Sequence, residues 1–380
     1  MPNEQGLPGL CPNEPPYMTA LAARARRERI PLAGSLDLTQ RCNLSCVHCY
    51  VGPAKPAESG GELGTSEWHG VIDQAAELGC LFLLLTGGEP LLREDFPTIY
   101  MHAREKGCIV SVFTNGTRVD DRIVGLFRDS PPKELEITIY GATAATHEAV
   151  TGVPGSHKRT LSAVDRLLAA GLRVKLKTVL MKQNLEELSE MQNLATKRDV
   201  PFRLDPAVFA RLSGDRGPTT LRVPARAAAR AELSDPIRRR HWRAYIERAR
   251  VLPTSDKLYN CGAGLSSFHV DPYGKLQPCL MTPHMSYELR TGSFRDGWRD
   301  HIPRIREVPA PPAFECNHCE RRAICGYCPG FFRLESGKET ERVEYLCNLG
   351  RHRLTWLQEE AGAANERAKH ETQTHTATSV

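Results

Sequence analysis

Short apolar and β-branched runs alternate with longer segments of helical period from residue 35 to about residue 206. Several of the short runs are too continuously apolar for half-exposed strands, which is typical of a parallel sheet covered on both faces. Each helical segment ends where the next strand should begin. The expected strands are Ser35–Thr39, Leu81–Thr86, Cys108–Thr114, Leu135–Tyr140, Leu172–Met181 and Phe202–Asp205, and the expected helices are Ser66–Leu78, Arg93–Lys106, Asp120–Arg128, Ser156–Ala170 and Leu185–Lys197.

These six strand–helix units predict an α/β fold, a parallel sheet curled into a partial (β/α)6 TIM-like barrel. After residue 206 the period fades, and the stretch from Arg222 to Arg250 is rich in alanine and arginine, as expected of a helical connector broken near Pro236. The next 90 or so residues are rich in cysteine, glycine, proline and aromatic residues, typical of a small module held by metal more than by a core. The expected organisation is an N-terminal extension over 1–34, the barrel over 35–215, the connector over 216–258, a small cysteine-rich domain over 259–350, and a C-terminal helix with a disordered tail over 351–380.

Composition excludes several classes of function. The chain has 380 residues, of which 41% are hydrophobic and 25% charged, enough apolar material for a full core. Its longest purely apolar run, Leu81–Leu85, is far short of the roughly 20 residues that cross a bilayer. A net charge of +5 is low for a dedicated nucleic-acid binder. We therefore expect neither a membrane protein nor a nucleic-acid-binding protein, and we expect a surface helix over Met18–Ile30.

Thirteen cysteines, an odd number grouped at short spacings, indicate metal ligation in a reducing cytoplasm rather than a disulfide framework. Cys42, Cys46 and Cys49 form a CxxxCxxC motif directly after the first expected strand. Three thiolates in one loop can hold three irons of a 4Fe-4S cube and leave the fourth iron open. A zinc site would need a fourth ligand, for which His48 is the nearby candidate, and a plain structural loop is the other alternative.

This spacing resembles the signature of the radical S-adenosylmethionine (SAM) superfamily. The resemblance extends to Thr86-Gly87-Gly88-Glu89-Pro90, which follows the second expected strand and is similar to the GGEP motif of that family. The glycines allow close approach of the backbone, and their carbonyls and the Glu89 carboxylate can receive the ammonium group of the SAM methionine.

The resemblance implies a mechanism and its cofactors. In this superfamily the SAM methionine chelates the open iron, the reduced cluster gives one electron to the sulfonium, and the resulting 5′-deoxyadenosyl radical abstracts a substrate hydrogen. Because the cluster must be reduced, the resemblance also implies an electron donor, either a reductase or a flavodoxin or ferredoxin. Further SAM contacts are implied at His48, Asn115, Thr138 and Lys177.

One position departs from the family. Many relatives have an arginine after the fourth strand, in a pattern like H-D-x-x-R-G. This chain reads His147-Glu-Ala-Val-Thr151-Gly152, so Thr151 stands where an arginine would bind the SAM carboxylate.

Seven more cysteines follow in the C-terminal region. The four from Cys316 to Cys328 alone fit a zinc ribbon, but seven is the wrong number for paired zinc sites. Their order resembles the SPASM extension of radical SAM enzymes, which holds two auxiliary 4Fe-4S clusters. The chain departs from the usual pattern by having two residues instead of three between Cys325 and Cys328. The resemblance implies an outer set of ligands, Cys316, Cys319, Cys325 and Cys347, and an inner set, Cys261, Cys279 and Cys328.

The inner set is one protein ligand short. Either its cluster has an open iron that can bind a substrate thiolate or amide, or a residue other than cysteine fills the place. The remaining cysteines suggest no chemistry: Cys80 and Cys108 are expected in the core, and Cys11 as a free surface thiol.

SPASM-bearing enzymes typically form thioether or carbon–carbon crosslinks in ribosomally made peptides, so the resemblance implies oxidative modification of a peptide. One alternative is a small-molecule oxidoreductase that acts on a sugar, cyclitol or tetrapyrrole. A sulfatase maturase is disfavoured because Leu280 stands where that type has an aspartate base. A further alternative is a non-catalytic scaffold that keeps its metals for structure or binds nucleic acid through the arginines after Arg222. It is disfavoured because a scaffold would need neither the CxxxCxxC motif nor the GGEP motif. The segment before Ser35 is too short for a precursor-recognition domain, so we expect a separate recognition protein.

Overall fold

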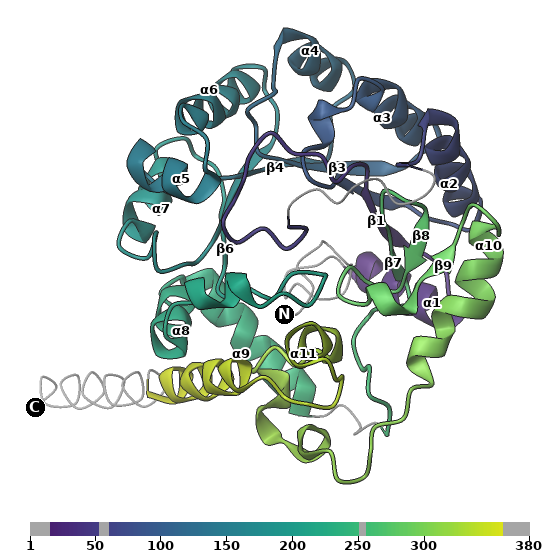
Figure 1. Ribbon diagram of the computed structural model, residues 1–380, viewed down its shortest axis with the longest axis vertical. Coiled ribbons are helices and arrows are strands. Elements are labelled where there is room, and N and C mark those ends of the chain that lie inside the picture. The colour runs from purple at the N-terminus through teal and green to yellow at the C-terminus, as the bar shows by residue number, and fades with distance from the viewer. Residues whose placement is uncertain (1–15, 53–60, 251–255, 360–380) are drawn as a thin grey trace, which may run out of the picture.

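The computed structural model, shown in Figure 1, describes residues 16–52, 61–250 and 256–359. Its centre is a curved sheet with the strand order β6-β5-β4-β3-β2-β1-β7-β8-β9, in which neighbours from β6 to β7 are parallel and the last two pairs are antiparallel. This confirms the predicted α/β partial barrel. The strands are β1 (Ala33–Asp37), β2 (Phe82–Thr86), β3 (Ile109–Thr114), β4 (Glu134–Thr138), β5 (Val174–Val179), β6 (Phe202–Asp205), β7 (Ser267–Val270), β8 (Lys275–Gln277) and β9 (Tyr287–Glu288).

Helices cover the outer face of the sheet, as Figure 1 shows. The six expected strands and five expected helices are all present, with ends displaced by up to three residues. Helix α5 was not expected. The N-terminal helix α1 lies where the sequence predicts a surface helix, and it buries Ala22 and Ala25 while most of its other side chains are exposed. The helices are α1 (Pro16–Glu28), α2 (Thr65–Glu77), α3 (Phe96–Glu105), α4 (Asp121–Asp129), α5 (Ala144–Thr151), α6 (Ser156–Ala169), α7 (Leu188–Thr196), α8 (Ala225–Leu233), α9 (Pro236–Arg250), α10 (Phe294–Asp296) and α11 (Pro329–Ser336), followed by a helix over residues 344–359.

The arginine-rich segment folds as two helices, α8 and α9, with a break between Leu233 and Pro236. It is fastened to the C-terminal helix by Arg353, whose guanidinium lies 2.7 Å from the Glu232 carboxylate, with both side chains buried. Trp242 donates a second hydrogen bond to Glu232. In Figure 1 these helices lie across the open side of the barrel, between β6 and α11. None of the helices in the described ranges is both long and apolar enough to span a bilayer.

The cysteine-rich region continues the barrel sheet instead of forming a sheet of its own. Strand β7 pairs in parallel with β1, with His269 opposite Ser35. The two strands meet closely at Gly34, where an added Cβ would lie 2.2 Å from the Phe268 ring. Strands β7 to β9 were not expected from the sequence, because they are only four, three and two residues long and such short runs show no clear period.

We expect Gly34→Val to destabilise the protein by about 1–3 kcal/mol, because the added side chain overpacks the contact between β1 and β7. Urea unfolding monitored by circular dichroism measures the change. Gly125→Ala is the matched control, since Gly125 lies within α4 and an added Cβ meets nothing within 4 Å. A Gly34→Val protein that unfolds at the wild-type urea concentration would contradict the close contact.

Candidate active site

The loop that follows β1 carries Cys42, Cys46 and Cys49 and crosses the open end of the barrel in Figure 1. The three thiols are close enough to affect one another's ionisation. Burial raises the pKa of Cys46 to about 12, and the charges of Cys49 and Cys42 add to the effect. Three thiols that repel one another as thiolates fit a polynuclear iron centre, whose positive charge would stabilise all three in the ligating form.

The end of α5, distant in the sequence, holds this loop through backbone hydrogen bonds. The amides of Ser45 and Val47 donate to the carbonyls of Thr151 and Val150 at the end of α5, at 2.8 and 3.0 Å. The fully buried Thr151 hydroxyl pairs with the Ser156 hydroxyl at 2.8 Å. Thr151 stands where the family pattern has an arginine. Its carbonyl accepts a hydrogen bond from the cysteine loop, so Thr151 helps to hold that loop.

The GGEP segment packs directly on the residues that precede Cys42. The Gly88 amide donates to the Thr39 carbonyl at 2.7 Å. A Cβ added to Gly87 would lie 2.4 Å from that same carbonyl, and one added to Gly88 would lie 2.4 Å from the Arg41 carbonyl. Gly87 also has a φ of +135°. The two motifs therefore form one backbone cradle that only glycine fits.

Glu89 is fully buried at the ends of the central strands. Its carboxylate accepts hydrogen bonds from the Thr114 hydroxyl at 2.7 Å, the Asn115 amide at 2.7 Å and the Leu91 amide at 3.1 Å. Burial raises its pKa to about 6. Pro90 begins the short 3-10 helix Pro90–Leu92 that follows. Glu89 thus ties the GGEP turn to the end of β3, and its predicted contact with the SAM ammonium stays a prediction.

Asn115 connects this carboxylate to the cysteine loop. Its side-chain amide donates to the Asn43 side chain at 3.0 Å and approaches the Cys42 sulfur at 3.9 Å. Glu89 and the cysteine loop are therefore connected through Asn115.

His48, Thr138 and Lys177 come together on the other side of the mouth. His48 packs edge-on against the Tyr140 ring at 4.7 Å, and Thr138 lies opposite Lys177 in the pairing of β4 with β5. Burial, followed by the charge of Lys177, lowers the pKa of His48 to about 4. Its buried Nδ1 has no hydrogen-bond partner among the described residues, which fits a bound ligand such as the base of a nucleoside.

Lys177 also forms ion pairs within the protein, in addition to its expected contact with SAM. Its ammonium lies 3.0 Å from the Asp205 carboxylate and 3.7 Å from that of Glu136, inside the barrel. The lysine is therefore already paired.

We expect Gly88→Ala to weaken SAM binding by at least tenfold while the protein stays folded. The added methyl group collides with the Arg41 carbonyl and displaces the cysteine loop from the GGEP turn. Equilibrium dialysis of the reconstituted enzyme against labelled SAM measures the effect. Gly70→Ala is the control, because a Cβ there meets nothing within 4 Å. Unchanged SAM affinity in Gly88→Ala would disprove the role of the cradle.

The seven C-terminal thiols separate into two groups by their electrostatic influence on one another. Burial raises the pKa of Cys316 to about 11, and the thiolates that add to it all belong to the outer set. Burial raises the pKa of Cys279 to about 12, and the thiolates that add to it are those of Cys328 and Cys261, the inner set. Tyr327 lies between the groups, because thiolates of both sets raise its pKa. These groups coincide with the predicted ligand sets, whose binding of clusters stays a prediction.

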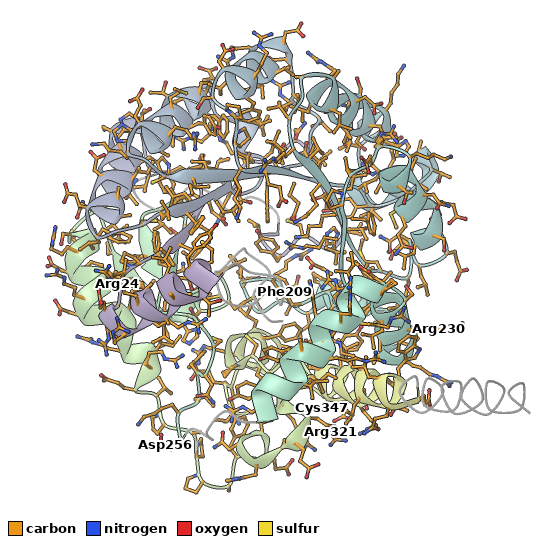
Figure 2. The ribbon with its side chains drawn as sticks, turned by 180° about the vertical axis from the view of Figure 1, so that it is seen from behind. Arg24, Phe209, Arg230, Asp256, Arg321 and Cys347 are labelled. Atoms are coloured by element: carbon orange, nitrogen blue, oxygen red, sulfur yellow. The ribbon has the colours of Figure 1, made fainter. Side chains whose placement is uncertain are left out.

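Close backbone packing fixes both groups. A Cβ on Gly330 would lie 2.4 Å from the Met281 carbonyl, so the start of α11 is pressed against the turn after Cys279. A Cβ on Gly350 would lie 2.6 Å from that of Cys325, and Figure 2 shows Cys347 on the same C-terminal helix.

In the described part of the chain no three His, Cys, Asp or Glu side chains are placed to hold one metal ion. Tetrahedral zinc, with Zn–S bonds of about 2.3 Å, would need thiolates about 3.8 Å apart. A 4Fe-4S cube, in which each thiolate binds a different iron, separates its ligands further. Zinc and a cluster therefore require different separations between the thiolates, and the binding of two auxiliary clusters stays a prediction.

Aromatic rings join the cysteine loop to the inner set. Tyr50, which follows Cys49, stacks on Phe209 with ring centres 5.5 Å apart, and Phe209 lies 6.1 Å from Phe331 in α11. Figure 2 places Phe209 between the barrel and the C-terminal helices. Cys328 is the N-cap of α11, and its sulfur accepts a hydrogen bond from the Phe331 amide at 3.4 Å.

Sequence reasoning missed several residues that shape this site. Arg93 is buried, donates to the Leu38 carbonyl at 2.9 Å and pairs with Asp95 at 2.7 Å, which holds the end of β1. Asp37 was missed too, although an acidic residue in a strand expected to be covered on both faces was a visible signal.

Comparison with known proteins agrees with this geometry. Residues 36–195 match the family model described as the radical SAM superfamily. The AdoMet-dependent heme synthase of Methanosarcina barkeri is 27% identical over 341 residues, which cover 81% of this chain and 94% of that protein. The mycofactocin maturase MftC of Mycobacterium tuberculosis is 26% identical over 316 residues, which cover 78% of this chain and 77% of that protein.

Among solved structures, Streptococcus suis SuiB bound to its precursor peptide SuiA has a similar fold, with a TM-score of 0.67 at 16% identity over 88% of this chain and 82% of SuiB. The cysteine-rich C-terminal region is consistent with a SPASM extension. The motifs, the fold and these similarities identify residues 36–195 as a domain of the radical SAM superfamily.

Proposed function

We propose that this enzyme oxidatively modifies a peptide, forming a thioether or carbon–carbon crosslink in a ribosomally made precursor. The observation that carries the proposal is the division of the C-terminal thiols into a group of four and a group of three, which suits two auxiliary clusters that can accept an electron from a substrate. Similarity to MftC, named as a maturase, and to the fold of SuiB, solved with a precursor peptide, supports a peptide substrate.

The chain's own residues divide the task. Cys42, Cys46 and Cys49 would hold the 4Fe-4S cluster that, with SAM, supplies a hydrogen-abstracting radical. The GGEP cradle and His48 would hold SAM against the cysteine loop. The outer and inner sets would each hold one auxiliary 4Fe-4S cluster.

A tetrapyrrole is the second candidate substrate, because the heme synthase relative is covered over 94% of its length. The charges inside the barrel argue against it. Lys177 pairs with Asp205 at 3.0 Å, Lys175 with Glu134 at 3.0 Å, and Arg203 with Glu136 at 3.1 Å. A substrate that carries several carboxylates needs cations that are not already neutralised. A barrel interior whose cations are already paired with carboxylates suits an uncharged peptide segment better.

Two partners belong to this proposal. An iron–sulfur centre that must be reduced before each SAM cleavage needs an electron donor such as a flavodoxin, a ferredoxin or a reductase. A separate recognition protein would deliver the precursor peptide.

The test compares the two substrates directly. Anaerobically reconstituted enzyme with dithionite and SAM is given either a short peptide encoded beside the gene or an iron porphyrin that carries propionate groups. We expect the peptide to lose the mass of two hydrogen atoms per crosslink, with 5′-deoxyadenosine formed. A modified porphyrin and an unchanged peptide would establish the second candidate instead.

A further inference from the structure

Three polar side chains lie against one another in the barrel wall beneath the cysteine loop. The Ser35 hydroxyl is 2.8 Å from Nδ1 of His269, and Nε2 of His269 is 3.8 Å from the Asp37 carboxylate. All three are buried, with Asp37 5% exposed. Their strand neighbours Leu36 and Phe268 belong to the main hydrophobic core with the surrounding helices, so the polar three face the interior of the barrel.

These three residues lie between two of the proposed iron–sulfur centres, that of the cysteine loop and that of the inner set. Asp37 is opposite Thr86, which leads into the GGEP turn, and Cys42 follows it by five residues. His269 is opposite Ser35, two residues before Asp37 in β1, and on its other side it is opposite Gln277 in β8. Strand β8 ends at Gln277, and Cys279 of the inner set follows it by two residues.

The surroundings of Asp37 suit a group that exchanges protons. Burial, and then the charge of Asp271, raise its pKa to about 7. Burial lowers the pKa of His269 to about 3, so the imidazole is neutral. If the Ser35 hydroxyl donates to Nδ1, His269 carries its proton on Nε2, the ring nitrogen that lies 3.8 Å from the Asp37 carboxylate. The titratable groups that face Asp37 are His269 from β7, Asp271 from the turn after β7, and Tyr50 from the cysteine loop.

We propose that Asp37 is the base that removes a proton from the substrate during its oxidation, with His269 and Ser35 as positioning residues. This rests on the proposed oxidative function. The substrate loses one hydrogen atom from carbon to the deoxyadenosyl radical. A neighbouring N–H, O–H or S–H group then gives its proton to the Asp37 carboxylate and one electron leaves to an oxidised auxiliary iron–sulfur cluster, as the new bond forms. The turn after Cys279 offers Leu280 and therefore no base of its own.

The first test separates radical formation from oxidation. In the reconstituted Asp37→Asn holoenzyme we expect 5′-deoxyadenosine formation within about threefold of wild type, while oxidised peptide per 5′-deoxyadenosine falls by about 10²-fold or more. In wild type this ratio should rise between pH 6 and pH 8, as Asp37 loses its proton. The matched control is Glu134→Gln, another interior carboxylate, which pairs with Lys175 on β5 and should keep the wild-type ratio. A wild-type ratio in Asp37→Asn would overturn the proposal.

The second test needs no substrate. The pKa of Asp37 is about 7 in the folded protein against an ordinary value of 3.8, so the native state binds this proton more tightly than the unfolded chain. Wild-type stability should therefore fall as pH rises through 7, and Asp37→Asn should gain in melting temperature relative to wild type between pH 5.5 and pH 8. A difference that does not change with pH would overturn the proposal. If wild type leaves the peptide unmodified, the proposed function fails by itself, and this melting experiment still decides whether Asp37 titrates near neutral pH.

Discussion

Replacing Cys42, Cys46 and Cys49 together by alanine should abolish SAM cleavage and remove about a third of the iron. The reconstituted wild-type enzyme should hold roughly twelve irons per chain, and the triple variant roughly eight. The reason is that the three thiols lie in one loop and interact electrostatically, whereas the C-terminal thiols form two groups of their own. Iron and sulfide assays, with chromatography of 5′-deoxyadenosine after dithionite and SAM are added, measure both effects.

The control removes a thiol that the fold uses only for packing. Cys108 is buried at the start of β3, and its sulfur approaches the Cys80 carbonyl at 3.8 Å. Cys108→Ala should lose stability but keep all of the iron and all of the SAM cleavage. A triple variant that still forms 5′-deoxyadenosine would show that the cluster is held elsewhere.

The barrel could be predicted because its strands and helices carry strong local patterns. Strand β2 is a continuous apolar run, since both its faces are covered, and β3 to β6 recur at the spacing of strand–helix units. The cysteine and GGEP motifs could be placed at one mouth because the C-terminal ends of parallel strands meet there.

The parts that were missed depend on contacts between distant segments. Helix α5 is only eight residues long and has a weak period, and its end is held by hydrogen bonds to the cysteine loop. Strand β9 has two residues and exists only because β8 gives it an edge.

Charged residues of the barrel wall were missed for the same reason. Glu136 and Asp205 look like ordinary polar positions in the sequence, and only the strand register brings them to Lys177. Thr151 is a related case. The sequence marked it as a departure from the family pattern, but it did not predict the contact of Thr151 with the cysteine loop.

Removing the inner set should separate SAM cleavage from substrate oxidation. In a variant with Cys261, Cys279 and Cys328 replaced by alanine, we expect roughly eight irons per chain, 5′-deoxyadenosine near the wild-type level, and oxidised peptide below detection. The physical reason is that the radical-forming loop makes its backbone contacts with the end of α5 and with the GGEP turn, and not with these thiols. Iron content and the ratio of oxidised peptide to 5′-deoxyadenosine are the measurements.

The outer set supplies the comparison, because one of its thiols, Cys316, also belongs to the packing of the C-terminal module. Cys316 is buried in a hydrophobic cluster with Phe314 and Leu346, so Cys316→Ala should lower stability as well as iron content. An inner-set variant that keeps its iron but loses zinc would show that the C-terminal thiols bind zinc, and the oxidative step would then lack its electron acceptor. An inner-set variant that loses four irons yet still oxidises the peptide would place electron transfer in the outer set, where Tyr327 lies between the two groups.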